Sequence, residues 1–122
     1  MGDRVLMQVV KATTGEFGPV VYCHWSGDQA PKIVERLRKR MADRMGDLDY
    51  WSARLVQETI GDSKGSTSFG IWNADAILEA DDSHGDAGVV VIDCDTGYVV
   101  CAGGYLTPKD FGMDVIEEGS FS

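Results

Sequence analysis

The chain of 122 residues is long enough to bury one hydrophobic core and short for two domains. Its formal net charge of −9 disfavours direct contact with nucleic acid or an anionic membrane, because both are polyanions. No apolar run approaches the roughly 20 residues that span a bilayer, and no secretory signal is visible, so we expect one cytoplasmic domain over residues 1–122.

The first two predicted elements are strands joined by a turn. Residues 4–12 carry the apolar and β-branched side chains of a buried strand, and residues 20–25 do the same. Residues 13–19 between them are rich in turn formers, which indicates a hairpin. Gly27 and Asp28 then supply turn and N-cap chemistry for a helix.

Two helices are predicted next. In residues 29–45 apolar side chains recur every four positions, which is the pattern of an amphipathic helix facing a core. Gly46 ends this helix, and a second helix is expected over residues 50–60. We expect Leu37 of the first helix and Trp51 of the second to be buried.

The second half is predicted to return to β structure. Residues 67–72 suit a short strand, and residues 73–88 are acidic and irregular. The clearest hairpin joins residues 88–93 to residues 98–102, because the turn at 95–97 ends in a glycine that tolerates positive φ.

These elements predict an α+β fold in which an antiparallel sheet packs against two helices. Side chains alternate along a strand, so Val90 and Ile92 share one face of the second hairpin. We expect them to meet Val99 and Cys101 of the returning strand. The chain from about residue 107 is expected to be a mobile tail.

The three cysteines are expected to be reduced. Cys23, Cys94 and Cys101 form an odd set, which favours a reducing cytosol. Cys23 cannot form a local thiol–imidazole pair with His24, because neighbours on a strand point to opposite faces. A disulfide between Cys94 and Cys101 would need an oxidising compartment and is the less favoured alternative.

Charge is segregated along the chain. Residues 32–44 contain six basic residues against two acidic ones, whereas residues 62–122 contain two basic residues against twelve acidic ones. The acidic half has few local cations, so we expect it to contact a basic protein surface. The acids expected to form this face are Asp75, Glu79, Asp81, Asp82, Asp86, Asp93 and Asp95.

A rival interpretation is that these acids only keep the domain soluble. The contact would then use the basic helix at Arg36, Lys39 and Arg40. Charge runs of this kind are most often solvated helix faces, so the basic helix is also consistent with a purely structural role.

No catalytic residue, cofactor or metal site is predicted. Residues 81–86 include metal-ligand types, but their spacing is not that of a calcium loop, and a lone histidine is a poor zinc site. His24 and Trp25 are expected to close the strand-to-helix corner, where a buried ring and indole need partners. The alternative is that this corner forms a small-molecule pocket or an enzymatic site.

The corner also carries a resemblance. The pattern Tyr22-x-His24-Trp25-x-Gly27, followed by a helix with Leu37, resembles small proteins of tailed phages and prophages. By size, acidity and fold class the chain is similar to anti-CRISPR and other anti-defence inhibitors.

This resemblance implies a non-enzymatic inhibitor in the cytoplasm of a bacterial host cell. Its partner would be a nucleic-acid-binding defence complex, bound through a face that mimics nucleic acid. No residue role carries over from these proteins. The alternative is an immunity or antitoxin-like partner of a basic toxin, and a homo-oligomer is left open.

Overall fold

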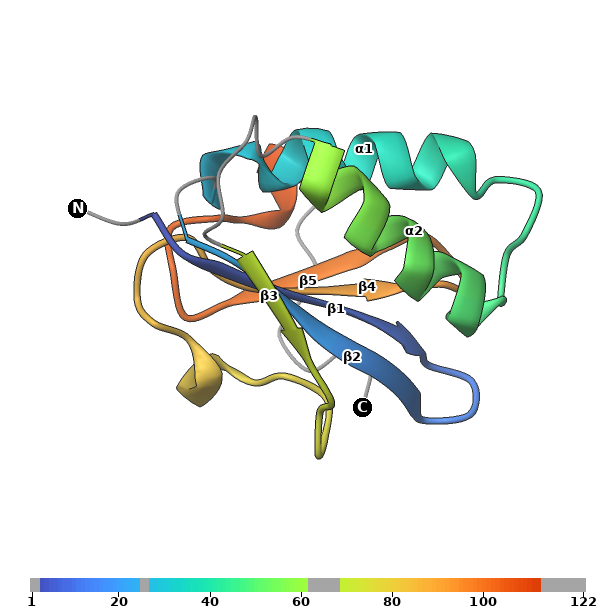
Figure 1. The fold of residues 1–122 in the computed structure, drawn as a ribbon, viewed down its shortest axis with the longest axis horizontal. Helices are drawn as coiled ribbons and strands as arrows, with labels where there is room; N and C mark the ends of the chain where they lie inside the picture. The colour runs from blue at the N-terminus through green and yellow to red at the C-terminus, as the bar shows by residue number, and fades with distance from the viewer. Residues whose placement is uncertain (1–2, 25–26, 62–68, 113–122) are drawn as a thin grey trace.

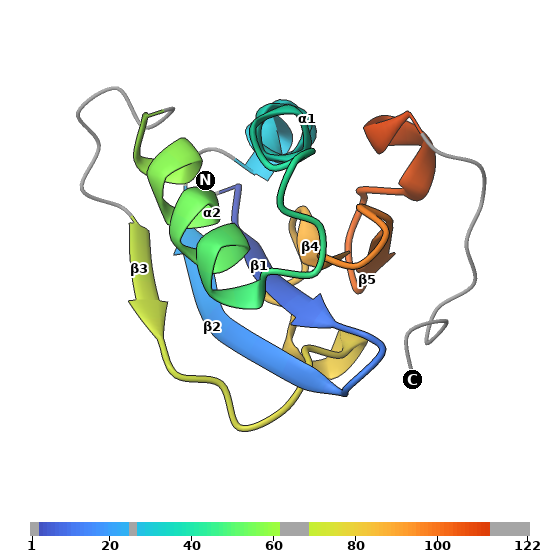
Figure 2. The ribbon, with the colours of Figure 1, turned by 90° about the vertical axis from the view of Figure 1, so that its right-hand side faces the viewer.

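The computed structural model describes residues 3–24, 27–61 and 69–112. The strands are β1 (Val5–Lys11), β2 (Glu16–Cys23), β3 (Phe69–Trp72), β4 (Gly88–Asp93) and β5 (Val99–Ala102). The helices are α1 (Ala30–Arg40) and α2 (Leu48–Gly61), with short 3-10 turns η1 (Gly27–Gln29), η2 (Ala80–Asp82) and η3 (Pro108–Phe111). The strands form one sheet in the order β3-β2-β1-β4-β5, and both helices cover one of its faces (Figures 1 and 2). The predicted α+β class is confirmed.

One pairing in the sheet is parallel. β1 runs parallel to β4, from Val5 opposite Gly88 to Val10 opposite Asp93, whereas the other three pairs are antiparallel. The chain leaves edge strand β3, crosses the helix-free face and re-enters the sheet beside β1 (Figure 1). A crossing of this length permits the parallel pairing, which a tight hairpin would not.

The first helix ends earlier than its sequence pattern predicts. α1 stops at Arg40, and Met41 has left the helical region at φ −101° and ψ 11°. Gly46 adopts φ +82°, and its N–H donates to the carbonyl of Cys94 at 2.7 Å. This contact ties the connection to the end of β4, so the chain turns toward α2 although the apolar periodicity continues.

The core lies on both faces of the sheet. Leu37 and Trp51 are fully buried beneath the helices, as predicted. The Trp51 indole also donates to the carbonyl of Arg44 at 2.8 Å, which satisfies its polar atom. On the helix-free face, the partly buried Ile77 and Leu78 pack against a second buried cluster: Leu6, Val10, Val20, Val89 and Val91.

The register of the second hairpin is confirmed. Val90 lies opposite Cys101, and Ile92 lies opposite Val99. Cys94 follows Ile92 beyond the paired region and therefore lies about four strand positions, roughly 13 Å, from Cys101. That separation is too long for a disulfide, and all three cysteines are free and buried.

The last described residues pack onto the domain. Thr107 precedes η3, and Phe111 at its end is 7% exposed and belongs to the core beneath the helices. Gly112 closes the turn at φ +73°. The rest of the predicted tail, residues 113–122, lies outside the described residues.

Candidate functional site

An exposed acidic surface lies on residues 73–86, named here the acidic segment. It contains no lysine or arginine. It runs along the side of the sheet opposite the helices, below the strands in Figure 1. Figure 2 shows the same arrangement from a perpendicular direction. The charges of the segment are therefore separated from the basic helix by the thickness of the sheet.

Gln8 holds the acidic segment in place. Its side chain is fully buried in the middle of β1. The amide nitrogen donates to the carbonyls of Gly18 and Ala76 at 3.0 and 3.2 Å, and the amide oxygen accepts from the N–H of Leu78 at 2.8 Å. These contacts anchor the backbone of the acidic segment to the central strand, although the connection between β3 and β4 is long.

Four of the predicted acids are exposed on this segment, and we call them the acidic face: Asp75, Glu79, Asp81 and Asp82. The carboxylate of Asp82 accepts from the N–H of Glu79 at 2.8 Å and shapes the turn η2. None of the four forms an ion pair with a cation in the part of the chain that the structure describes. The acidic face thus presents uncompensated negative charge to solvent.

Asp86 lies at the end of the segment and is already paired. One of its carboxylate oxygens accepts from Arg4 twice, from the side-chain Nε at 2.7 Å and from the backbone N–H at 3.1 Å. The side-chain hydrogen bond from Arg4 lowers the pKa of Asp86 below its ordinary value, so the carboxylate stays charged. Asp86 therefore fastens the segment to the start of β1.

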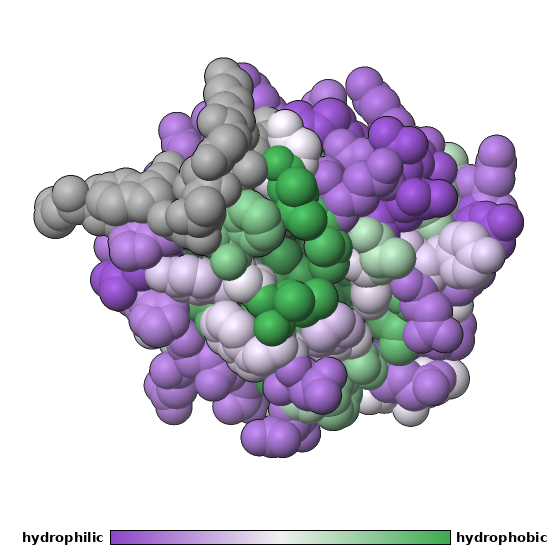
Figure 3. Space-filling model, in the orientation of Figure 1, coloured by the Kyte–Doolittle hydropathy of each residue, from purple (hydrophilic) through white to green (hydrophobic). Residues whose placement is uncertain are grey.

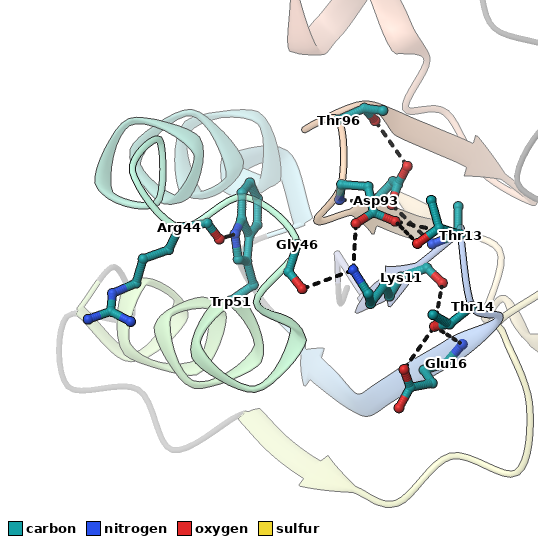
Figure 4. A network of polar contacts seen from close by, with 11 residues as sticks. Lys11, Thr13, Thr14, Glu16, Arg44, Gly46, Trp51, Asp93 and Thr96 are labelled. Atoms are coloured by element: carbon teal, nitrogen blue, oxygen red, sulfur yellow. Dashed lines mark hydrogen bonds and ion pairs between the residues drawn. The ribbon is translucent and has the colours of Figure 1, made fainter.

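Asp93 does not lie on the acidic face. It is 3% exposed, at the end of β4. One carboxylate oxygen accepts from the backbone N–H of Ala12 and of Asp95, and the other accepts from the hydroxyl of Thr96 (Figure 4). A carboxylate enclosed in this way shapes the turn between β4 and β5, so we leave it out of the partner-binding surface.

Asp95 has a similar structural role. One oxygen accepts from the Lys11 ammonium at 2.8 Å, and the other accepts from the hydroxyl and the N–H of Thr13. The hydrogen bond from Lys11 lowers the pKa of Asp95. Lys11 also donates to the carbonyl of Gly46, so one cation joins the end of β1 to two loops (Figure 4).

This corner brings together residue types that can bind a metal, but their ligand atoms are engaged in hydrogen bonds or protonated. Ligand atoms of Asp93, Cys94 and Asp95 lie within 4.8 Å of one another. All four carboxylate oxygens already accept hydrogen bonds. Burial raises the pKa of the Cys94 thiol to about 11, which disfavours the thiolate that binds a metal. The arrangement serves the fold.

The arginines of the basic helix are engaged within the domain. Arg36 and Arg40 donate to the two carboxylate oxygens of Glu58 at 2.9 and 2.8 Å. Glu58 projects from α2 and is 7% exposed. The pair therefore clamps α1 to α2. Lys39 is 77% exposed and pairs with Glu35 at 3.4 Å, so it is the most accessible of the three predicted cations.

The predicted corner at His24 is partly described, because Trp25 lies outside the described residues. The backbone carbonyl of His24 accepts from the N–H of Asp3 at 2.7 Å, which fixes the end of β2. The Tyr22 ring lies about 6 Å from three other rings, those of His24, His84 and Trp72. These rings form a partly exposed aromatic group at the edge of the sheet.

An open depression of about 430 Å³ lies elsewhere, between β2 and α2. Phe17 and Pro19 line it together with Ser52. The hydroxyl of Ser52 is buried and finds no hydrogen-bond partner among the described residues, but it packs against the backbone of Gly18. It does not mark a ligand site on its own.

Two residues that organise the surface were not singled out from the sequence. Gln8 interrupts the apolar run of β1, and Glu58 continues the buried stripe of Trp51 and Leu55 on α2 at helical spacing. A polar side chain at a core position is the signal that could have found both, because burial requires a partner.

Comparisons of the chain with models of protein families, with curated proteins and with solved structures find no match. The fold and the surfaces define a small α+β domain with an acidic side and a helix-covered basic side. No helix in the described ranges is long and apolar enough to cross a bilayer.

Proposed function

We propose that this protein is a non-enzymatic inhibitor that binds the basic surface of a nucleic-acid-binding bacterial defence complex. The observation that supports the proposal is the acidic face, Asp75, Glu79, Asp81 and Asp82, on an anchored segment with no local cation. Carboxylates in such an arrangement can occupy a groove whose lysines and arginines otherwise hold phosphates.

The distribution of charge supports directed binding. The acidic segment and the helices lie on opposite sides of the sheet (Figure 1). Such a separation gives the molecule an electrostatic polarity, so a basic surface attracts the acidic side during approach. The anchoring of the backbone by Gln8 reduces the ordering that binding would otherwise require.

The basic helix is the weaker candidate for the contact. The Nε–H groups of Arg36 and Arg40 already donate to the carboxylate of Glu58. A partner that used them would have to replace these bonds and leave a buried carboxylate without its cations. That replacement is costly for a group as enclosed as Glu58.

The first experiment identifies the partner by affinity capture from a bacterial lysate with mass spectrometry. Binding to the purified partner is then compared for wild type and for Asp75→Lys with Asp81→Lys. Both positions are exposed, so the fold should persist. The control, Glu35→Lys with Asp43→Lys, makes the same charge change on exposed positions of the helix side.

We expect the Asp75/Asp81 variant to associate more slowly and the control to bind like wild type. Affinity should fall as salt rises, because ions screen the attraction between the charges. The range of that attraction, the Debye length, is about 8 Å at physiological ionic strength. Wild-type binding by the Asp75/Asp81 variant, with binding lost in Lys39→Glu, would contradict the proposal. Capture of a basic toxin would instead assign an immunity-type role.

The inhibitor mode has its own readout. Addition of the protein should release a labelled nucleic acid from the captured complex, and the protein alone should not bind that nucleic acid. If the protein binds the complex but the labelled nucleic acid stays bound, then the protein is a binding partner of the complex and not its inhibitor.

A further inference from the structure

β3 is an edge strand with large exposed apolar side chains. Among the described residues it pairs only with β2. Phe69, Ile71 and Trp72 are 36%, 54% and 45% exposed, and Ile60 at the end of α2 is 45% exposed. Figure 3 shows hydrophobic residues, in green, across the middle of this face of the molecule. We name the four residues Ile60, Phe69, Ile71 and Trp72 the apolar stripe.

Within the ranges that the structure describes, this edge lacks the usual protection against strand addition. Proteins commonly guard an edge with a charged side chain, a proline or a bulge. β3 has the sequence Phe-Gly-Ile-Trp and pairs with β2 without a register shift. The other edge strand, β5, has η3 packed against it. The exposed edge of β3 therefore favours pairing with another strand.

The faces of β3 restrict how a strand can be added. Ile71 and Phe69 lie opposite Val21 and Cys23, whose side chains belong to the core beneath the helices. Phe69 and Ile71 thus point to the helix side of the sheet. Trp72 comes directly after Ile71, so its side chain points to the opposite, helix-free side of the sheet.

We propose that this edge binds β3 of a second copy of the chain, antiparallel and about a two-fold axis perpendicular to the sheet. With Gly70 opposite Gly70 of the second copy, each Phe69 lies opposite an Ile71. Both helix layers then remain on the same side of a continuous sheet. Aromatic and β-branched residues that face each other across antiparallel strands are a stabilising combination.

Because the apolar stripe carries no charge, it suits a second copy of β3 better than a basic segment of another protein. β3 has no charged side chain, so a basic segment laid along it would lose water around its cations without gaining a counter-charge there. A second β3 brings apolar surface and no charge. The net charge of −9 on each copy still opposes approach, so salt should strengthen this contact. That dependence is opposite to the one expected for the acidic face.

The edge strand has only four residues, and stable interfaces bury roughly 800 Å² per partner, so we expect a reversible dimer. Sedimentation equilibrium of the full chain, over a range of concentrations and at low and high salt, tests it. The test variant is Ile71→Lys, which places a charge opposite Phe69 of the second copy. The matched control is Tyr98→Lys, because Tyr98 is also 54% exposed and lies outside the apolar stripe.

We expect wild type and the Tyr98 variant to dimerise with rising concentration, more tightly at high salt, and the Ile71 variant to stay monomeric with an unchanged melting temperature. If the Ile71 variant unfolds, Ile71→Thr keeps a strand-forming residue and should weaken the dimer. Amide exchange of wild type should also slow at residues 69–72 as concentration rises. A monomeric wild type, or a dimer that persists in both Ile71 variants, would overturn the proposal.

Discussion

The side-chain oxygen of Gln8 accepts a hydrogen bond from the backbone N–H of Leu78 at 2.8 Å, across 70 residues of chain. The same amide group donates to the carbonyl of Ala76. Through this one buried side chain the central strand determines where the acidic segment lies. A surface with a proposed binding role therefore depends on a core residue that never reaches solvent.

Replacing Gln8 with alanine should release the acidic segment. The change removes two partly buried hydrogen bonds, to the carbonyl of Ala76 and from the N–H of Leu78, and their loss should cost about 1–3 kcal/mol in total. Chemical denaturation should show this loss, and the Leu78 amide should exchange faster. The same substitution at exposed Gln57 is the control. Unchanged exchange at Leu78 would show that Gln8 does not hold the segment.

Replacing Glu58 with glutamine should loosen α1 from α2. Burial acts to raise the pKa of Glu58, but the hydrogen bonds from Arg36 and Arg40 outweigh it, and the pKa is lowered overall. Loss of the charged partner should reduce the free energy of unfolding by roughly 1.5–3 kcal/mol at pH 7. The control, Glu35→Gln, removes an exposed pair and should change stability by less than about 0.5 kcal/mol.

The same clamp predicts a dependence on pH. A carboxyl group whose pKa is lower in the folded state stabilises the fold above its unfolded pKa, about 4.3 for glutamate. This stabilisation is lost as pH falls through the folded pKa. The Glu58→Gln variant should therefore lose less stability than wild type between neutral and acidic pH, measured by denaturation at each pH. Parallel pH curves would contradict the assignment.

Truncation of Leu37 to alanine should destabilise the domain by roughly 2–5 kcal/mol, because it opens a cavity beneath α1. Met45→Ala is the comparison, since Met45 is 47% exposed and lies beyond the end of α1. It should cost far less. Similar melting temperatures for the two variants would mean that α1 does not pack on the sheet as described.

All three thiols should react only after unfolding. Burial raises the pKa of Cys94 to about 11 and of Cys101 to about 12, so few molecules carry a thiolate at pH 8. Alkylation of native protein should be slow. Under denaturing, non-reducing conditions, mass spectrometry should find three modified cysteines, and only one would reveal a disulfide.

Local sequence patterns predicted much of the fold. The spacing of apolar residues identified both helices and the burial of Leu37 and Trp51, and strand alternation predicted that Val90 and Ile92 would meet Val99 and Cys101. These features depend on which side of an element faces the core, and that periodicity is written in neighbouring residues. The segregation of charge between the two halves is likewise a property of the sequence alone.

Only the tertiary structure decided which charged groups remain available. Asp95 meets Lys11 across 84 residues, and Glu58 meets Arg36 across 22, so these two carboxylates are engaged within the fold, whereas Asp75 and Asp81 stay exposed. The same holds for the backbone. The parallel pairing of β1 with β4 and the early end of α1 depend on contacts made through space. A carboxylate binds whichever cation the fold brings within about 3 Å, and local periodicity carries no record of that neighbour.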